Sequence, residues 1–269
     1  MIDAAPSAGR TGLSELLTRA LETEQTYFEL GARLEDLAGA VLAWTPGFVA
    51  APAASVVHRV EPDAIVGRGR EWLAGAESRL EELGIPLARI YLMARHEGME
   101  TLLSNAGYAC REEILFADAL PEPAAPLTFR PVVSDDDWAR KRAFHRGVPE
   151  SPDGHCNGAA ELARLEQHKC AHGMEAFIAE IGGRTVGVAG AIWGEGIVRI
   201  KNLLVHPDFR RQAVATTLMS HIAAHGRARG ISEQCLVALK GGTGEMLYRS
   251  LGMTVVGSCF EWSRRLGEQ

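Results

Sequence analysis

The chain has 269 residues, of which 46% are hydrophobic and 23% charged, which predicts a soluble protein with one large or two smaller domains. The formal net charge of −6 gives no overall attraction to nucleic acid or an anionic membrane, and it mildly favours a cationic substrate. The five cysteines are scattered without a CxxC pair, so a disulfide framework or structural zinc site is not expected, and a cytoplasmic location is.

The first predicted element is a helix whose apolar residues recur every three to four positions, the spacing of a buried face. These residues are Leu13, Leu16, Leu17, Ala20, Leu21, Tyr27 and Phe28. We assign this helix no function. No apolar run along the chain reaches the length that a bilayer-spanning helix needs.

The stretch LPEPAAPLTF at 120–129 interrupts two patterned regions with three prolines, which is typical of a linker. We therefore divide the chain into an N-terminal domain (1–119), a linker (120–126) and a C-terminal domain (127–269). In the C-terminal domain, Ser134 and three following aspartates predict a helix start. The further expected elements are a helix at 159–172, a three-strand antiparallel meander at 176–181, 185–193 and 197–205, a helix from Val214 toward Gly230, a strand at 235–239, a short helix at 243–251 and a last strand at 254–262.

Two stretches of the N-terminal half recur in the C-terminal half at one separation. VEPD at 60–63 is similar to VHPD at 205–208, and ETLLSNAGY at 100–108 is similar to EMLYRSLGM at 245–253. Both pairs are 145 residues apart, which indicates two copies of one βα unit. The first copy lacks the charge of Arg210 and Arg211, which correspond to Ile65 and Val66, or with a one-residue gap to Ala64 and Ile65. It also lacks the hydroxyl of Tyr248, since Leu103 stands at that position.

The turn VHPDFRRQAVATTLM at 205–219 has the outline of an anion-binding site, because a helix start offers unpaired N–H groups and partial positive charge. Neither a P-loop nor a GxGxxG dinucleotide motif is present. Ala213 and Ala215 stand where phosphate loops usually have glycine. Alanine serves there if the turn stays at negative φ, so these residues allow a cradle of narrower geometry.

The order of these elements, with two motifs, resembles the GNAT superfamily of N-acetyltransferases. The pyrophosphate motif Arg/Gln-x-x-Gly-x-Gly/Ala is similar to RRQAVA at 210–215, and the second signature, a tyrosine four residues before a glycine, is similar to Tyr248 and Gly252. The resemblance covers 127–262 well and the first half more loosely. It implies an α+β fold, with a mixed, mostly antiparallel sheet flanked by helices in three layers and built from two related halves.

By this resemblance the ligand is acetyl-CoA, the acyl donor. The backbone of Gln212, Ala213, Val214, Ala215 and Thr216 would receive the pyrophosphate, Arg210 and Arg211 would add charge, and Leu203, Leu204 and Val205 would bond the pantetheine arm. Tyr248 would protonate the departing thiolate. Two departures from the family pattern are Ala213 for the first glycine and Gly241 for a frequent asparagine.

No general base is evident, because the strand before the turn, IVRIKNLLV, has no carboxylate. The candidates are His145, His155, His168 and His172, while Glu175 and Glu180 are expected to face solvent. His168 and His172 are one helical turn apart, but zinc needs more ligands, so no metal is expected. The tripeptide Gly67-Arg68-Gly69 keeps a Gly-x-Gly at the equivalent helix start of the first copy, which we interpret as a structural relic of a cofactor site.

Two functions fit this pattern. In the first, the C-terminal copy acetylates a primary amine of a small molecule or peptide by direct attack on the thioester, and the degenerate copy shapes the acceptor cleft. In the second, the protein is a non-catalytic acyl-CoA-binding or regulatory protein with a GNAT fold. Neither nucleic acid nor membrane is an expected partner, the protein is expected to be a monomer or homodimer, and the sequence does not name the acceptor.

Overall fold

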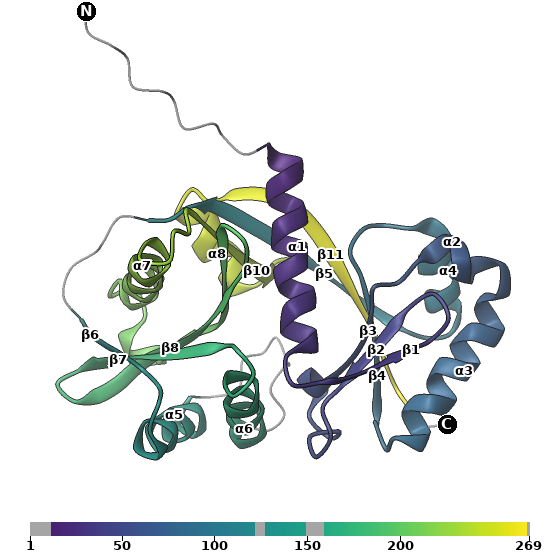
Figure 1. Ribbon diagram of the computed structural model, residues 1–269, viewed down its shortest axis with the longest axis horizontal. Helices are drawn as coiled ribbons and strands as arrows, with labels where there is room; N and C mark the ends of the chain where they lie inside the picture. The colour runs from purple at the N-terminus through teal and green to yellow at the C-terminus, as the bar shows by residue number, and fades with distance from the viewer. Residues whose placement is uncertain (1–11, 122–126, 149–158, 268–269) are drawn as a thin grey trace, which may run out of the picture.

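The computed structural model describes residues 12–121, 127–148 and 159–267, which form one mixed sheet of eleven strands flanked by helices (Figure 1). Among the described strands, only the β3–β4 and β9–β10 pairs are parallel, so the sheet is mostly antiparallel. The α+β class and the two related halves expected from the sequence are confirmed.

The N-terminal half contributes the first part of this sheet and the helices around it. Its strands are β1 (Arg33–Asp36), β2 (Val41–Trp44), β3 (Ser55–His58), β4 (Leu87–Leu92) and β5 (Ala109–Ala119). Its helices are α1 (Leu13–Glu29), α2 (Pro62–Ile65), α3 (Gly69–Glu82) and α4 (Glu97–Asn105), with 3₁₀ turns η1 (Pro52–Ala54) and η2 (Val66–Arg68).

The C-terminal half follows the order of elements expected from its sequence. Its strands are β6 (Thr128–Pro131), β7 (Glu175–Ile181), β8 (Arg184–Trp193), β9 (Ile197–Val205), β10 (Glu233–Leu239) and β11 (Thr254–Arg265). Its helices are α5 (Asp135–Gly147), α6 (Ala159–Cys170), α7 (Val214–Arg227) and α8 (Thr243–Ser250), with the 3₁₀ turn η3 (Pro207–Phe209). The predicted start of α5 is confirmed, because Ser134 and Asp137 bond each other's backbone N–H groups in a capping box.

The two halves keep the separation found in the sequence. Helices α3 and α7 begin at Gly69 and Val214, 145 residues apart, and strands β5 and β11 begin at Ala109 and Thr254, again 145 residues apart. The internal repeat is therefore confirmed as a repeat of structure.

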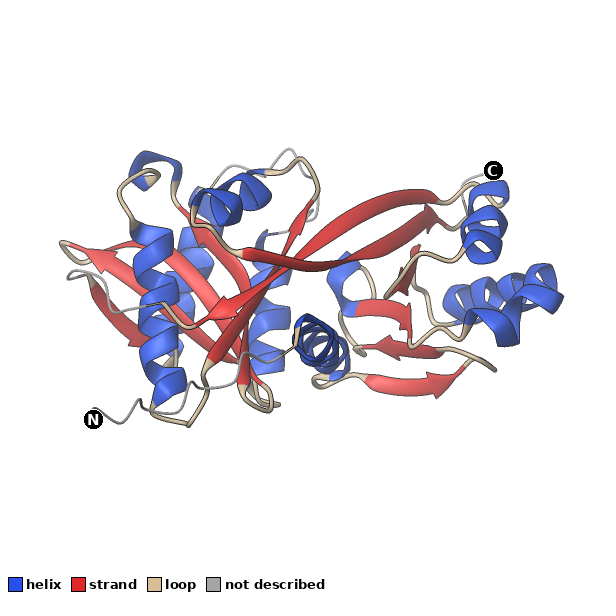
Figure 2. Ribbon diagram, turned by 90° about the horizontal axis from the view of Figure 1, so that it is seen from above, coloured by secondary structure: helices blue, strands red, loops and turns tan. Residues whose placement is uncertain are grey.

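The last strand of each half pairs with strands of the other half. The strand order is β1-β2-β3-β4-β11-β5-β10-β9-β8-β7-β6, so β11 lies between two strands of the N-terminal half and β5 lies beside β10. Figure 2 shows the long strands passing from one half to the other. Neither half has a complete sheet by itself. The proposed domain bounds stay a prediction, and residues 122–126 of the proposed linker lie outside the described residues.

Helix α1 lies at the centre of the molecule and contacts strands of both halves (Figure 1). Its predicted apolar face is confirmed for residues such as Leu16, Ala20 and Phe28, whereas Leu13, at the first helical position, is 61% exposed. The same helix buries Glu24, whose carboxylate binds Arg199 at 2.6 Å and Lys201 at 2.7 Å on β9. Although burial alone would raise it, these two cations lower the pKa of Glu24 to about 2. A buried ion cluster thus ties α1 to the C-terminal half.

Candidate functional site

Strands β9 and β10 separate partway along their length. They pair only from Ile197 opposite Glu233 to Arg199 opposite Cys235, after which β10 continues beside β5 up to Leu239. Beyond Arg199, the edge of β9 that faces β10 has no ladder partner among the described strands. The separation leaves an opening in the sheet next to residues 203–205.

An irregularity in β9 contributes to this opening. The register between β8 and β9 shifts at residues 201–204, and Asn202 has a φ of +52°. Its side chain donates a hydrogen bond of 2.6 Å to the buried Glu166, which pairs with Lys141 at 2.8 Å. Burial alone would raise the pKa of Glu166, but Lys141 and His145 lower it to about 2. The bulge is therefore held by a buried, ionised network from α5 and α6.

The turn between β9 and α7 differs from the conformation expected for its alanines. Arg211 has a φ of +61° and Ala213 a φ of +58°, so the condition of negative φ, under which alanine fits the turn without strain, is not met at Ala213. Outside glycine, this left-handed conformation costs roughly 1–2 kcal/mol per residue. This local backbone cost is outweighed by the packing of β9 and the buried helix α7, which the turn connects.

Helix α7 begins without a side-chain cap at Ala213. Its first internal bond runs from Thr217 N to Ala213 O at 2.9 Å, so the N–H groups of residues 214–216 have no hydrogen-bond acceptor among the described residues. Arg211 is exposed and makes no ion pair with the described residues, while Arg210 Nε donates to Val205 O at 3.4 Å. Free amides, the positive helix end and two arginines together form a site suited to an anion.

A cavity of about 430 Å³, which we call the C-terminal pocket, joins these features. It is lined by Leu203, Leu204, Val205, Phe209, Arg210, Arg211, Ala213, Val214, Ala215, Thr216, Thr243, Gly244, Leu247 and Tyr248. The pocket thus brings together every residue that the sequence analysis assigned to the site except Gln212. The side chain of Gln212 donates instead to Asp208 O at 3.0 Å.

Tyr248 reaches this pocket from α8, and its ring packs edge-on against Phe116 at 5.4 Å between centroids. Burial raises the pKa of Tyr248 to about 12, with Arg199 acting weakly in the opposite direction. The hydroxyl therefore keeps its proton at neutral pH and can donate it or a hydrogen bond.

The histidines considered as general bases lie elsewhere. His145 belongs to the buried network of Glu166, at 3.4 Å from its carboxylate. His168 contacts Gly31 O at 2.9 Å, and its ring lies tilted against that of His172 with 4.5 Å between the centroids. His145, His168 and His172 do not line the C-terminal pocket. His155 lies outside the described residues. The described chain holds no group of three or more His, Cys, Asp or Glu side chains that could bind a metal ion.

The two glutamates set aside in the sequence analysis form ion pairs. Glu175 binds Arg229 at 2.6 Å, and Glu180 lies 3.3 Å from Arg130. In contrast, Glu113 on β5 was not predicted as a site residue, and it lines a second cavity on the other face of the sheet. The signal available was a charged residue in the inward-facing set of an apolar strand, since Leu115 and Ala117 follow it at alternate positions.

Comparison with known proteins agrees with this geometry. A family model described as an acetyltransferase (GNAT) domain matches residues 172–254. This range includes the meander, the turn and Tyr248. No curated protein matches the chain in sequence.

Several solved structures share the fold over most of the chain. A conserved protein of unknown function from Staphylococcus epidermidis has a TM-score of 0.70 at 14% identity, covering 90% of this chain and 96% of its own. A GCN5-related N-acetyltransferase from Kribbella flavida has a TM-score of 0.63 at 14% identity, covering 94% and 96%. A tandem GNAT protein from the clavulanic acid biosynthesis pathway has a TM-score of 0.59 at 14% identity, covering 93% and 88%.

The C-terminal half therefore contains a GNAT acetyltransferase domain, matched over residues 172–254. Over most of its length it has the fold of a tandem GNAT protein. Within the described residues, no helix combines the length and apolar character needed to cross a membrane.

Proposed function

We propose that this protein is an acetyl-CoA-dependent N-acetyltransferase whose C-terminal half binds the coenzyme. The observation that carries the proposal is the C-terminal pocket, which joins a separated strand edge, an uncapped helix start and a buried tyrosine. These are the three kinds of group that a long ligand with a phosphate end and a reactive end requires.

The residues of the pocket fit the parts of such a ligand in order. The amides of residues 212–216, with Arg210 and Arg211, suit the pyrophosphate, and the free edge of residues 203–205 suits the amide groups of the pantetheine arm. Acetyl-CoA would supply an acetyl group activated as a thioester. Tyr248 would stabilise the departing sulfur by donating from its hydroxyl, while the fixed position of both reactants supplies most of the acceleration.

The acceptor in this proposal is a primary amine of a small molecule or a peptide. We expect the protein to act in the cytoplasm as a monomer or homodimer, with neither nucleic acid nor membrane as a partner. The mildly acidic charge of the chain is consistent with a cationic acceptor.

A calorimetric titration with acetyl-CoA tests the coenzyme site, with matched arginine variants in the two copies. We expect one site per chain and a fall in affinity of roughly tenfold for Arg211→Ala, because one charged contact to phosphate is lost. Arg70→Ala, at the exposed start of α3, should leave the affinity unchanged. Two sites, or equal effects of both variants, would contradict this assignment.

An assay of acetyl transfer to a panel of amines distinguishes the two functions. Saturable binding of acetyl-CoA without transfer to any amine of a broad panel would favour a non-catalytic acyl-CoA-binding protein. The specific observation that favours that alternative is that the described residues lining the C-terminal pocket include neither a carboxylate nor a histidine. One amine acetylated at a rate that depends on Tyr248 would exclude it.

A further inference from the structure

A second cavity of about 160 Å³, which we call the central chamber, lies on the face of the sheet covered by α1. Its walls come from α1, η1, β4, β5, α6, β9 and β11, so both halves contribute to it. Ile114 and Phe116 of β5 belong to the core beneath α7 and α8, whereas Leu115 and Ala117 pack with α1. Because side chains alternate along a strand, Glu113 lies on the α1 face, opposite Tyr248.

The linings of the two cavities meet at the bulge of β9. Lys201 and Asn202 line the central chamber, and the next residue, Leu203, lines the C-terminal pocket. The separation of β9 from β10 beyond Arg199 opens the sheet at this point. A thioester held in the C-terminal pocket beside residues 203–205 would therefore lie close to residues that line the chamber.

The charges of the chamber are paired, with one exception. Its lining includes the cations Arg89 and Lys201. Arg89 binds Glu261 and also donates to Pro52 O at 2.7 Å, and Lys201 binds Glu24 at 2.7 Å. Both cations are thus already committed to carboxylates of the chamber.

Glu113 is the exception. It accepts a hydrogen bond of 2.6 Å from the buried Tyr91 hydroxyl, but it makes no ion pair with the described residues. Burial and the carboxylate of Glu24 raise the pKa of Glu113, although Lys201 and Tyr91 act in the opposite direction. An enclosed carboxylate without a cationic partner is costly, and a positively charged ligand would remove that cost.

We propose that the central chamber binds the acceptor of the acetyl transfer, a small primary amine whose ammonium group pairs with Glu113. This inference rests on the proposed function and names its substrate class. A cavity of this volume accommodates a ligand of roughly six to ten non-hydrogen atoms, since a cavity of about 150 Å³ holds benzene. Peptides and oligosaccharides are too large to enter it whole.

The test compares Glu113→Gln with Glu112→Gln, its neighbour on the opposite face of β5. Glu112 binds Lys240 at 2.8 Å and does not line the chamber. Gln at position 113 has nearly the same shape and can still accept from Tyr91, and thermal melting of both variants checks that they fold. Binding of pentylamine and benzylamine is measured on the full chain with coenzyme A present, by ligand-observed NMR, with pentanol and benzyl alcohol as neutral counterparts.

We expect the amines to bind the unchanged protein and Glu112→Gln alike, and to bind Glu113→Gln at least tenfold more weakly, because a charged hydrogen bond is lost. Pentanol and benzyl alcohol should not displace the amines from the unchanged protein. With acetyl-CoA, the KM for the amine should rise in Glu113→Gln while the acetyl-CoA affinity stays the same.

The outcomes separate the two proposals. If neither amine binds, or if both bind Glu113→Gln as tightly as the unchanged protein, the chamber assignment is overturned. The proposed coenzyme site still stands in that case when acetyl-CoA binds at one site per chain. If acetyl-CoA itself does not bind, the proposed function fails whatever the amines do.

Discussion

Helices α3 and α7 are equivalent elements of the two halves, and their first turns differ. In the C-terminal copy, residues 211–213 form an open turn with two positive φ angles before α7 begins at Val214. In the N-terminal copy, the equivalent residues 66–68 form η2, which leads directly into α3, and the N–H of Gly69 donates to Val66 O. One copy leaves amides free for a ligand, whereas the other uses part of them internally.

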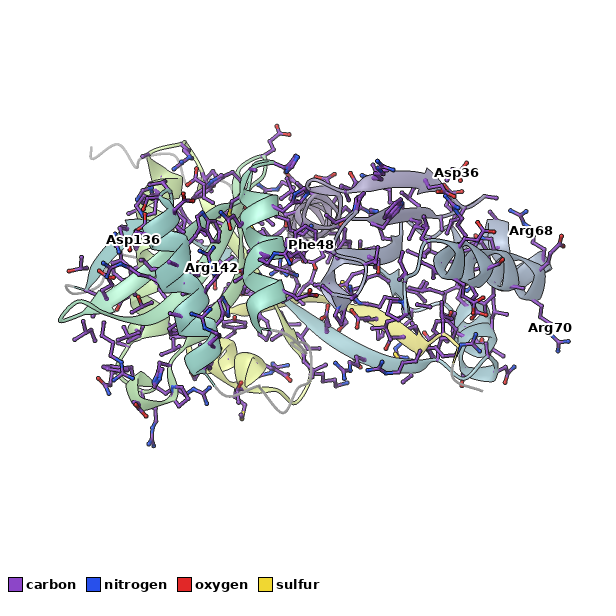
Figure 3. All side chains as sticks on the ribbon, turned by 90° about the horizontal axis from the view of Figure 1, so that it is seen from below. Asp36, Phe48, Arg68, Arg70, Asp136 and Arg142 are labelled. Carbon is purple, nitrogen blue, oxygen red and sulfur yellow. The ribbon has the colours of Figure 1, made fainter. Side chains whose placement is uncertain are left out.

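Side chains close the N-terminal copy further. A Cβ added to Gly69 would lie 2.8 Å from Leu102 Cδ2, so Leu102 of α4 sits directly on the start of α3. Leu103 is fully buried where the other copy has Tyr248. An open depression of about 500 Å³ remains over residues 66–71, and Figure 3 shows Arg68 and Arg70 at the outer end of this half.

This difference shows which features of a repeat depend on the core and which on the site. Helices α3 and α7 have 14 residues each and begin 145 residues apart, because both follow a buried apolar face. The pocket depends on the short turn at residues 211–213 and on the two helix positions that face it, which Leu102 and Leu103 occupy in the N-terminal copy and Leu247 and Tyr248 in the C-terminal copy. A copy can therefore lose the pocket and keep its fold.

The largest expected effect is on turnover in the copy that keeps the pocket. Tyr248→Phe removes the hydroxyl and should lower kcat by roughly a hundredfold or more, the usual contribution of a positioned acid, with little change in acetyl-CoA affinity. The matched control is Tyr108→Phe in the N-terminal half, whose hydroxyl donates to Glu77 at 2.8 Å. Steady-state kinetics with any accepted amine measures both variants. Equal kcat values in the two variants would remove Tyr248 from the mechanism.

The second effect concerns His58, which stands at the end of β3 where the other copy has Leu203. His58 is fully buried without a hydrogen-bond partner among the described residues, and Glu29 lies 3.6 Å away. Burial lowers its pKa to about 4, although Glu29 raises it and Arg59 lowers it further. Because the unfolded chain takes up this proton near pH 6.5 and the folded chain does not, folding stability is lost as the pH falls from 6.5 toward 4.

His58→Leu should therefore gain stability over the unchanged protein by roughly 2 kcal/mol on going from pH 7 to pH 5. Chemical denaturation at both pH values measures the difference. Parallel pH profiles for the two proteins would show that His58 is protonated in the folded chain, and would contradict its burial as a neutral group.

Local patterns predicted much of the fold and of the C-terminal pocket. The meander, the start of α5 and the turn before α7 follow from alternation, capping residues and motif spacing, which act over a few neighbours. The exchange of β5 and β11 could not be predicted in this way, because alternation fixes which face of a strand is buried but not its partner. Glu113 was missed for a related reason, since the other residues around its cavity come from six separate elements.

The positive φ of Ala213 was also beyond prediction, and it leads to the smallest expected effect. The C-terminal copy has alanine at 213, where φ is positive. Gly67, one residue before the equivalent position in the N-terminal copy, does not have a positive φ, and no atom would contact an added Cβ. Glycine and alanine are thus placed in the reverse of their backbone preferences. The two copies allow opposite substitutions to be compared within one protein.

Ala213→Gly should stabilise the protein by about 0.5–1 kcal/mol, because glycine adopts the left-handed conformation without strain. Ala215→Gly, two residues further on and inside the first turn of α7, should destabilise it by a similar amount, because glycine is a poor helix former. Gly67→Ala should stabilise the N-terminal copy, because it restricts the unfolded chain at a compatible position. Thermal melts of the three variants give the signs, and a loss of stability in Ala213→Gly would mean that the turn is not held at positive φ. If Ala213→Gly also leaves the acetyl-CoA affinity unchanged, the strain at this position belongs to the path of the chain into α7 and not to the ligand.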